Sequence, residues 1–430
     1  MSAISRFRAR LISFELDASD GVQMVHIEDG VLSLSGTKIA GVQSTAEYLG
    51  QGGDIEACED LRPALIMPGF IDTHLHAPQY RIMGAFGTRL LDWLEKYAFP
   101  AELAFADAQY AAAEAEHFVN TMLANGTTSS QLFTTTHAHT CDALFAAAAK
   151  RNLCLIAGKV MMDQNAPSGL LSAAEVCARE TQTLIDRWHH RGRAAYALTP
   201  RFAITSSERQ LDYCRGLRQA NPTVLVQTHL SENPEELAEV SRLFPGAKDY
   251  LDVYESYNLL GPSSTFAHCI HLSDGERSRL FDSQSKVAFC PSSNLFLGSG
   301  LLDVAEIPWD NFSVASDVGG GTSMSMLTTC AEAYKVCQLK NRTLHPYELL
   351  YAATAGNAKA LRLEQEVGQL KEGFWADFIV VDAEHDIVLR KTNWGLEHLE
   401  GALFSLIMFG GRQNILRTYV AGELVHGGAS

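Results

Sequence analysis

The residues best suited to catalysis or metal binding are His74 and His76. They are separated by one residue, at the end of an apolar run that follows Pro68-Gly69. Side chains two apart on a strand point to the same side, so we expect both imidazoles to face one way. His229 and Asp317 end two later apolar runs. Three imidazoles and a carboxylate suit Zn²⁺, with Fe²⁺ as the alternative, and leave a position for water. We therefore predict one metal ion per chain, held by His74, His76, His229 and Asp317.

Two further groups are placed to move protons beside that metal. Glu232 follows His229 by three residues, and His268 ends another apolar run. A carboxylate desolvated at the mouth of a site can have its pKa raised towards neutrality, as a proton shuttle requires. His268 or Asp317 is expected to accept the proton of the water. The predicted catalytic residues are Glu232, His268 and Asp317.

Two other patterns compete with this site. The pair His137 and His139 lies in a Thr-rich stretch, where surface histidines are ordinary, and we expect it to bind no metal. Lys159, inside another apolar run, could be the carboxylated lysine of a two-metal site. Glu232 argues against that alternative, because a two-metal enzyme takes its nucleophile from the bridging hydroxide. A single buried histidine is commonly a hydrogen-bonded core residue. Polar groups at the ends of several successive strands are hard to explain by such a structural role.

Eight apolar runs alternate with helical stretches through the middle of the chain, which favours parallel β/α units. They are Leu65–His76, Gly126–Phe133, Leu153–Met162, Ala194–Phe202, Thr223–Glu232, Thr265–His271, Lys286–Asn294 and Phe312–Val318. Eight such runs over about 250 residues match a (β/α)₈ barrel, whose catalytic groups gather at the C-terminal ends of the strands. We predict an α/β fold built on a TIM-like (β/α)₈ barrel.

The two ends of the chain differ from this middle part. Val22–Val42 alternates apolar and polar residues around Asp29-Gly30, and Phe378–Val381 and Leu416–Val425 do so around Ala421-Gly422. Such runs with glycine turns are typical of antiparallel strands. We expect both ends to form one small β-sandwich domain from residues 1–66 and 366–430, with the barrel at 67–365.

Charge and cysteine usage limit the partners. The 430 residues carry a formal charge of −16, which argues against nucleic acid because phosphates need Lys and Arg. No apolar stretch reaches the roughly 20 residues that span a membrane, and we expect no signal peptide. The nine cysteines are scattered without a C-x-x-C pair, which suits a reducing cytosol. We expect a cytoplasmic protein that binds neither nucleic acid nor membrane.

Nine motifs follow one another along nearly the whole chain. Three are PGFIDTHLH (68–76), ATAGNAKAL (353–361) and GQLKEGFWADFIVVD (368–382). The others are HAPQYRIMG (76–84), LLDWLEKYAFPAE (90–102), TPRFAITSS (199–207), THLSEN (228–233), FCPSSNLFLGSG (289–300) and ASDVGGGTSMSML (315–327). The first three resemble the amidohydrolase superfamily in general, and the other six resemble its guanine deaminase family.

This resemblance implies a homodimeric enzyme that uses zinc and water to convert guanine to xanthine and ammonia in purine catabolism or salvage. It implies the four metal ligands named above, Glu232 as proton shuttle and His268 as a helper beside the water. Gln79, Arg201 and Phe202 match family positions that contact the purine. An Arg fork suits the O6 and N7 acceptors of guanine, an amide suits its N1–H and O6 edge, and a phenyl ring can stack on it. The expected substrate contacts are Gln79, Trp93, Arg201, Phe202, His229 and Glu232, with the segment Leu90–Glu102 partly covering the ring.

Other functions on the same scaffold are alternatives. A related deaminase could act on a pterin, on 8-oxoguanine or on an adenine-like ring, although Arg201 favours a substrate that bears a carbonyl. A two-metal cyclic amidohydrolase and a non-catalytic binding protein are the remaining alternatives. The unrelated deaminases that need H-x-E followed by P-C-x-x-C are excluded, since the chain has no C-x-x-C.

Overall fold

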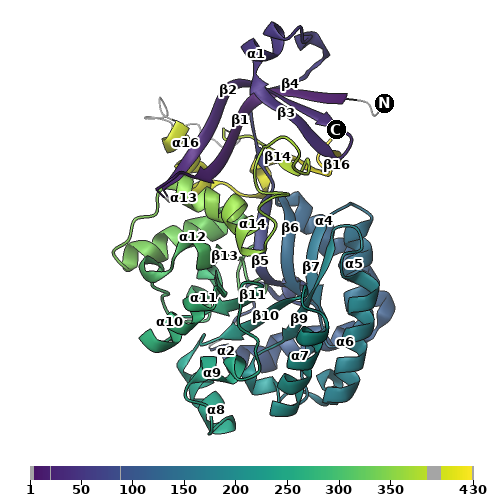
Figure 1. Ribbon diagram of the computed structural model, residues 1–430, viewed down its shortest axis with the longest axis vertical. Helices are drawn as coiled ribbons and strands as arrows, with labels where there is room; N and C mark the ends of the chain where they lie inside the picture. The colour runs from purple at the N-terminus through teal and green to yellow at the C-terminus, as the bar shows by residue number, and fades with distance from the viewer. Residues whose placement is uncertain (1–3, 20, 88, 385–398, 429–430) are drawn as a thin grey trace.

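The computed structural model describes residues 4–19, 21–87, 89–384 and 399–428. Their strands form two separate sheets. A parallel barrel wrapped in helices makes up the larger part of the molecule, and a smaller sheet lies at one end of it (Figure 1). Both ends of the chain lie beside the smaller sheet (Figure 1). All predicted metal ligands and catalytic residues lie on barrel strands or directly after them.

The barrel strands follow one another in chain order and pair in parallel. They are β5 (Phe70–His76), β6 (Thr127–Phe133), β7 (Cys154–Gly158), β9 (Ala194–Pro200), β10 (Leu225–Leu230), β11 (Ser264–His268), β12 (Lys286–Phe289) and β13 (Phe312–Val314), while β8 (Val160–Met161) pairs with β9. The backbone beyond β13 closes the ring against β5, because Asp317 N donates to His74 O at 2.9 Å and His76 N to Val318 O at 2.6 Å. The predicted (β/α)₈ barrel is confirmed.

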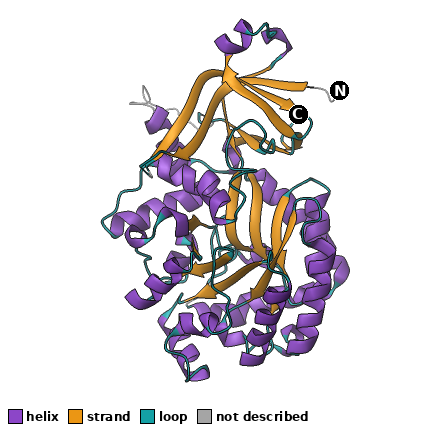
Figure 2. Ribbon diagram, viewed as in Figure 1, coloured by secondary structure: helices purple, strands orange, loops and turns teal. Residues whose placement is uncertain are grey.

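Helices that follow the barrel strands along the chain surround the barrel (Figure 2). They are α4 (Ala108–Ala124), α5 (Ala138–Ala149), α6 (Ala174–Trp188), α7 (Glu208–Ala220), α8 (Pro234–Leu243), α9 (Tyr250–Glu255), α10 (Asp274–Asp282), α11 (Pro291–Phe296), α12 (Met326–Leu339), α13 (Pro346–Tyr351) and α14 (Asn357–Ala360). Their apolar faces and the strands share one large buried core. Within the described ranges, no helix is both long enough and apolar enough to span a bilayer.

Seven strands from the two ends of the chain form the second sheet, which confirms the predicted separate β unit. Their order is β16 (Glu423–His426), β15 (Ile415–Val420), β14 (Phe378–Val381), β4 (Glu59–Pro68), β1 (Ile4–Leu16), β2 (Val22–Ser35) and β3 (Lys38–Ser44). All neighbours are antiparallel except β1 and β4. Helix α1 (Thr45–Gly50) packs against β2 and β3 of this sheet, and α16 (Leu399–Phe409) packs against α12 and α13. A separate core around Phe7, Phe378 and Tyr419 packs one face of this sheet.

One predicted turn is wrong and another is confirmed. Strand β2 continues through Asp29-Gly30, and the chain turns at Gly36 instead, where φ is +60°. Gly30 directly follows a bulge in β2, where Glu28 and Asp29 lie opposite Arg10 of β1, and a Cβ on Gly30 would approach Leu11 Cδ1 to 2.7 Å. The glycine therefore allows close strand contact, a role that local sequence does not distinguish from a turn. Ala421-Gly422 does form the turn between β15 and β16.

The predicted run Leu65–His76 serves both sheets. Strand β4 ends at Pro68 in the smaller sheet, and β5 begins at Phe70 in the barrel. Gly69 lies between them, where a Cβ would come within 2.1 Å of Thr128 Oγ1. Only glycine fits this crossing point, so the Pro-Gly pair marks the passage of the chain from one sheet to the other.

Candidate active site

The four predicted metal ligands lie together at the C-terminal end of the barrel. His74 and His76 come from β5, His229 from β10, and Asp317 follows β13. All four are buried, and one ligand atom of each lies within 4.8 Å of the others. Asp317 Oδ1 is 3.3 Å from His74 Nε2 and 3.3 Å from His76 Nε2. Chain segments more than 240 residues apart thus meet at one point, as their places at strand ends predicted.

The hydrogen bonds around the imidazoles leave lone pairs directed into the cluster. His229 Nδ1–H donates to the carbonyl of Arg201 at 2.6 Å, so its Nε2 is an acceptor, 3.1 Å from His76 Nε2. His74 Nε2 is buried without a hydrogen-bond partner among the described residues. A buried acceptor left unpaired is costly, and a cation among these atoms removes that cost. The donor set therefore fits a divalent metal.

Electrostatics keep these side chains in their ligand forms. Burial lowers the pKa of His76 to about 3. Burial and the neighbouring imidazoles likewise hold the pKa of His229 well below its usual value, so both rings are neutral. Burial alone would raise the pKa of Asp317. The interactions of this carboxyl group with His74 and His76 outweigh the effect of burial and hold the pKa of Asp317 well below its usual range. Neutral imidazoles and a charged carboxylate are the forms that bind metal.

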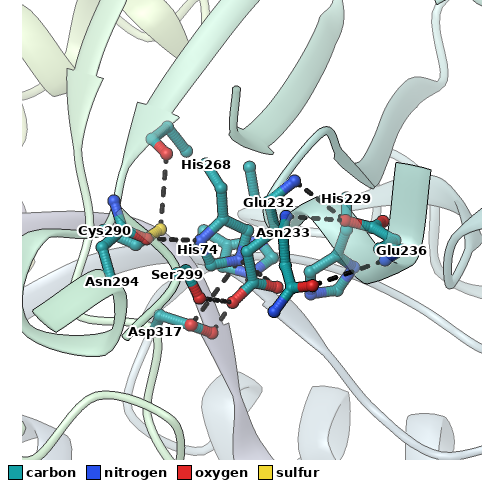
Figure 3. A network of polar contacts seen from close by, with 12 residues as sticks. His74, His229, Glu232, Asn233, Glu236, His268, Cys290, Asn294, Ser299 and Asp317 are labelled. Carbon is teal, nitrogen blue, oxygen red and sulfur yellow. Dashed lines mark hydrogen bonds and ion pairs between the residues drawn. The ribbon is translucent and has the colours of Figure 1, made fainter. Parts of the chain in front are cut away.

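Local structure places Glu232 beside this cluster. Strand β10 ends at Leu230, and Ser231 takes a left-handed backbone with φ of +51°, which turns the chain over the barrel mouth. Asn233 then caps α8, and Glu236 closes the capping box. The Glu236 carboxylate accepts the backbone N–H of Glu232 at 2.8 Å (Figure 3). The beginning of α8 therefore holds the Glu232 backbone in place.

The Glu232 carboxyl has one partner on each oxygen. Ser299 Oγ donates to Oε1 at 2.8 Å, and His268 Nε2 lies 3.4 Å from Oε2 (Figure 3). Burial, reinforced by the charge of Asp317, raises the pKa of Glu232 to about 8. Glu232 therefore holds a proton at neutral pH, which is the state from which it can donate one.

His268 lies between the two carboxyl groups. Its Nδ1–H donates to Asn294 Oδ1 at 2.8 Å, which orients the ring, and its Nε2 is 3.7 Å from Asp317 Oδ2. His268 and Asp317 both take left-handed backbone conformations, with φ of +70° and +49°. Such conformations at non-glycine residues persist only where the surrounding structure imposes them, and they cluster at functional sites.

A pocket opens directly onto these groups. Its wall contains all six predicted substrate contacts, namely Gln79, Trp93, Arg201, Phe202, His229 and Glu232. His268 and Asp317 line it as well, and Leu90 and Leu94 add apolar surface. Arg201 and Gln79 are almost fully buried, so their polar atoms face the pocket and their own partners rather than bulk water. The arrangement suits a flat ring with polar edges.

The competing patterns lie outside the cluster. His139 Nε2 donates to the carbonyl of Phe105 at 2.7 Å, and His137 stacks on His139. Lys159 is fully buried, and its Nζ lies 3.3 Å from Cys177 Sγ and 3.3 Å from Glu180 Oε2, both on α6. Its ammonium group is thus engaged by an outer helix, which argues against a bridging role between two metals.

Sequence reasoning missed three residues that support the site: Ser299, Asn294 and Glu102. Ser299 and Asn294 lie in the motif after β12 and contact Glu232 and His268. Glu102 is buried and accepts hydrogen bonds from Gln79 and Arg201. The only signal for Glu102 was a carboxylate placed among aromatic residues in the segment 90–102.

Comparison with known proteins places this site in a family. Residues 65–425 match the amidohydrolase family. The guanine deaminase of Escherichia coli (strain K12) is 42% identical over 403 residues, which cover 93% of this chain and 92% of that protein.

Solved structures agree with this relationship. The E. coli guanine deaminase structure superposes with a TM-score of 0.94 at 38% identity over all of both chains. The guanine deaminase of C. acetobutylicum, solved with guanine bound in its active site, superposes with a TM-score of 0.88 at 28% identity over 99% of this chain and 100% of that one. The chain belongs to the amidohydrolase family, and the similar members named above are guanine deaminases.

Proposed function

We propose that this chain is a zinc-dependent guanine deaminase that hydrolyses guanine to xanthine and ammonia. One observation carries the proposal: a metal-type ligand cluster, a protonated carboxyl and a histidine meet at one end of a pocket whose wall also holds Arg201, Gln79 and Phe202. The relationship to guanine deaminases supports the choice of substrate.

The metal would be held by His74, His76, His229 and Asp317. Three imidazoles and a carboxylate favour zinc, and the same set would accept Fe²⁺. A zinc ion bound here supplies Lewis acidity that activates water for attack near neutral pH.

Recognition of the ring would fall to other side chains in the pocket wall. The Arg201 guanidinium suits the carbonyl edge of guanine, and the Gln79 amide suits the adjacent N1–H. Phe202 offers a face for stacking, and Trp93 closes the pocket from the side of the helical segment. With these contacts, C2 of the ring would face the ligand cluster.

The side chains then move protons in a fixed order. Asp317 or His268 accepts a proton from water as its oxygen forms a bond to C2, while Glu232 protonates N3. Glu232 receives the proton taken from water and passes it to the exocyclic amine of the tetrahedral intermediate. The C2–N bond breaks and ammonia leaves, while the new C2 hydroxyl gives its proton to Glu232, so that xanthine remains and Glu232 is protonated again. His268 lies within reach of both carboxyl groups, so it can relay the proton between them.

Purified protein with its metal tests the proposal. Guanine, adenine, cytosine and a pterin are incubated separately, with ammonia release and the ultraviolet spectrum followed, and metal content is measured on the same sample. We expect guanine to yield xanthine and one equivalent of zinc per chain. Preferential turnover of the pterin would reassign the substrate, and two metal equivalents would favour the two-metal alternative.

We further propose that the enzyme is a cytoplasmic homodimer. All nine cysteines are free thiols and eight are buried, as suits a reducing compartment. The dimer rests on the family resemblance, and light scattering after gel filtration tests it. We also propose two domains, a β domain at residues 1–66 and 366–430 and a barrel domain at 67–365.

A further inference from the structure

A buried carboxylate stands behind the two residues proposed to recognise the purine. The helical segment 90–103 comprises α2 (Leu90–Trp93), a π-helical turn (Leu94–Ala98) and α3 (Phe99–Leu103). Its beginning lines the pocket. Its end carries Glu102, which is 1% exposed and accepts hydrogen bonds on Oε1 from Gln79 Nε2 at 2.7 Å and from Arg201 Nη1 at 2.6 Å.

The first of these bonds orients the Gln79 amide. A carboxylate can only accept hydrogen bonds, so the amide must turn its NH₂ group towards Glu102. Its carbonyl oxygen is then the acceptor left for a ligand. An acceptor in the pocket wall pairs with a ring N–H, whereas a ring nitrogen that carries a lone pair would be repelled.

The second bond fixes Arg201. One guanidinium nitrogen is taken by Glu102, and Phe99 of the same segment packs beside the group, with its ring centroid 5.4 Å from Cζ. The remaining N–H groups of Arg201 are donors for a carbonyl oxygen. Gln79 and Arg201 together thus present an acceptor and donors, which complement the N–H and C=O of a ring lactam.

Stability gives little reason for this arrangement. Glu102, Gln79 and Arg201 are all at most 2% exposed, and a buried ion pair contributes little net stability because desolvation opposes its attraction. Glu102 Oε2 is also buried without a hydrogen-bond partner among the described residues. We infer that Glu102 is a positioning residue that sets lactam specificity by fixing the hydrogen-bonding sense of Gln79 and the place of Arg201. The inference rests on the proposed function.

Glu102→Gln tests it at constant side-chain size. A neutral amide at 102 can also donate, so the Gln79 amide is free to flip and Arg201 loses its charge partner. kcat/KM is measured for guanine and for 2-aminopurine, which keeps the 2-amino group but lacks both O6 and N1–H. If 2-aminopurine is not turned over, its competitive inhibition constant replaces kcat/KM. We expect about a 10- to 100-fold loss for guanine, as for one charge-assisted hydrogen bond, and less than about threefold change for 2-aminopurine.

Glu114→Gln is the matched control. Glu114 is also buried and accepts hydrogen bonds from Arg81 and Tyr80, but on α4. The Glu114→Gln variant should leave the ratio of kcat/KM for guanine to kcat/KM for 2-aminopurine unchanged. Glu102→Asp, which keeps the charge but shortens the reach, should give a smaller loss of the same selective kind and serves if Glu102→Gln does not fold.

The outcomes separate the inference from the proposed function. Equal losses for guanine and 2-aminopurine, or no loss for either, would overturn the role of Glu102. If the unmodified protein binds zinc but does not deaminate guanine, the proposed function itself fails.

Discussion

Replacing Ser299 with alanine should move the pH dependence of deamination towards alkaline pH. Ser299 Oγ donates to Glu232 Oε1 at 2.8 Å, and both residues are buried. This bond stabilises the charged form of the carboxyl and opposes burial, which raises the pKa of Glu232 to about 8. Without the hydroxyl, burial acts with less opposition, and the pKa of Glu232 rises further.

The size of the shift follows from the strength of one hydrogen bond. A bond to a charged group contributes about 1.5–3 kcal/mol, and one pKa unit corresponds to about 1.4 kcal/mol. The pKa of Glu232 should therefore rise by about 1–2 units. In the proposed mechanism Glu232 must hold a proton before attack, so activity is present below its pKa and is lost as pH rises through it. The alkaline limb of the profile should move upward by a similar amount.

The assay is kcat/KM for guanine as a function of pH in the unmodified protein and in Ser299→Ala. Ionisation of guanine itself affects both proteins equally, so the difference between them reports on Glu232. Ser292→Ala is the control, because Ser292 Oγ accepts from the Thr322 backbone N–H at 3.1 Å instead. An alkaline limb that stays in place, or moves towards acid, in Ser299→Ala would refute the assignment of that limb to Glu232.

Three other perturbations test the site and the fold. Glu232→Gln should lower kcat by about 10²- to 10⁴-fold, as expected for loss of general acid–base catalysis, with metal content unchanged by atomic absorption; normal turnover would contradict the shuttle role. Removing zinc with a chelator should abolish deamination and lower the Tm, because a ligand that binds only the folded state stabilises it, and added zinc should restore both; an unchanged Tm would count against the buried ligand cluster. Asp377→Ala should reduce the free energy of unfolding by about 3–5 kcal/mol in denaturant titrations, because it leaves the buried Arg193 guanidinium, now 2.5–3.0 Å from the carboxylate, without its partner. A loss below about 1 kcal/mol would show that this pair does not hold the barrel to the smaller sheet.

Much of the barrel and of the metal cluster follows from local patterns. The alternation of apolar runs with helical stretches predicts parallel strands, and a closed parallel barrel brings all their C-terminal ends to one rim. Knowing that His74, His229 and Asp317 end such runs is therefore enough to expect them to meet. The Ala421-Gly422 turn is predictable for a similar reason, because its backbone conformation depends on those two residues.

Contacts between residues far apart along the chain are not encoded in any local pattern. Glu102 meets Gln79 across 23 residues and Arg201 across 99, and Ser299 meets Glu232 across 67. The protonation of Glu232 likewise depends on burial by the surrounding segments, and Asp29-Gly30 stays within β2 because β1 pairs with that strand on both sides of the β2 bulge. Periodicity reports which face of an element is apolar. Which polar side chain lies behind another depends on how separate elements pack, and that arises only when the whole chain is folded.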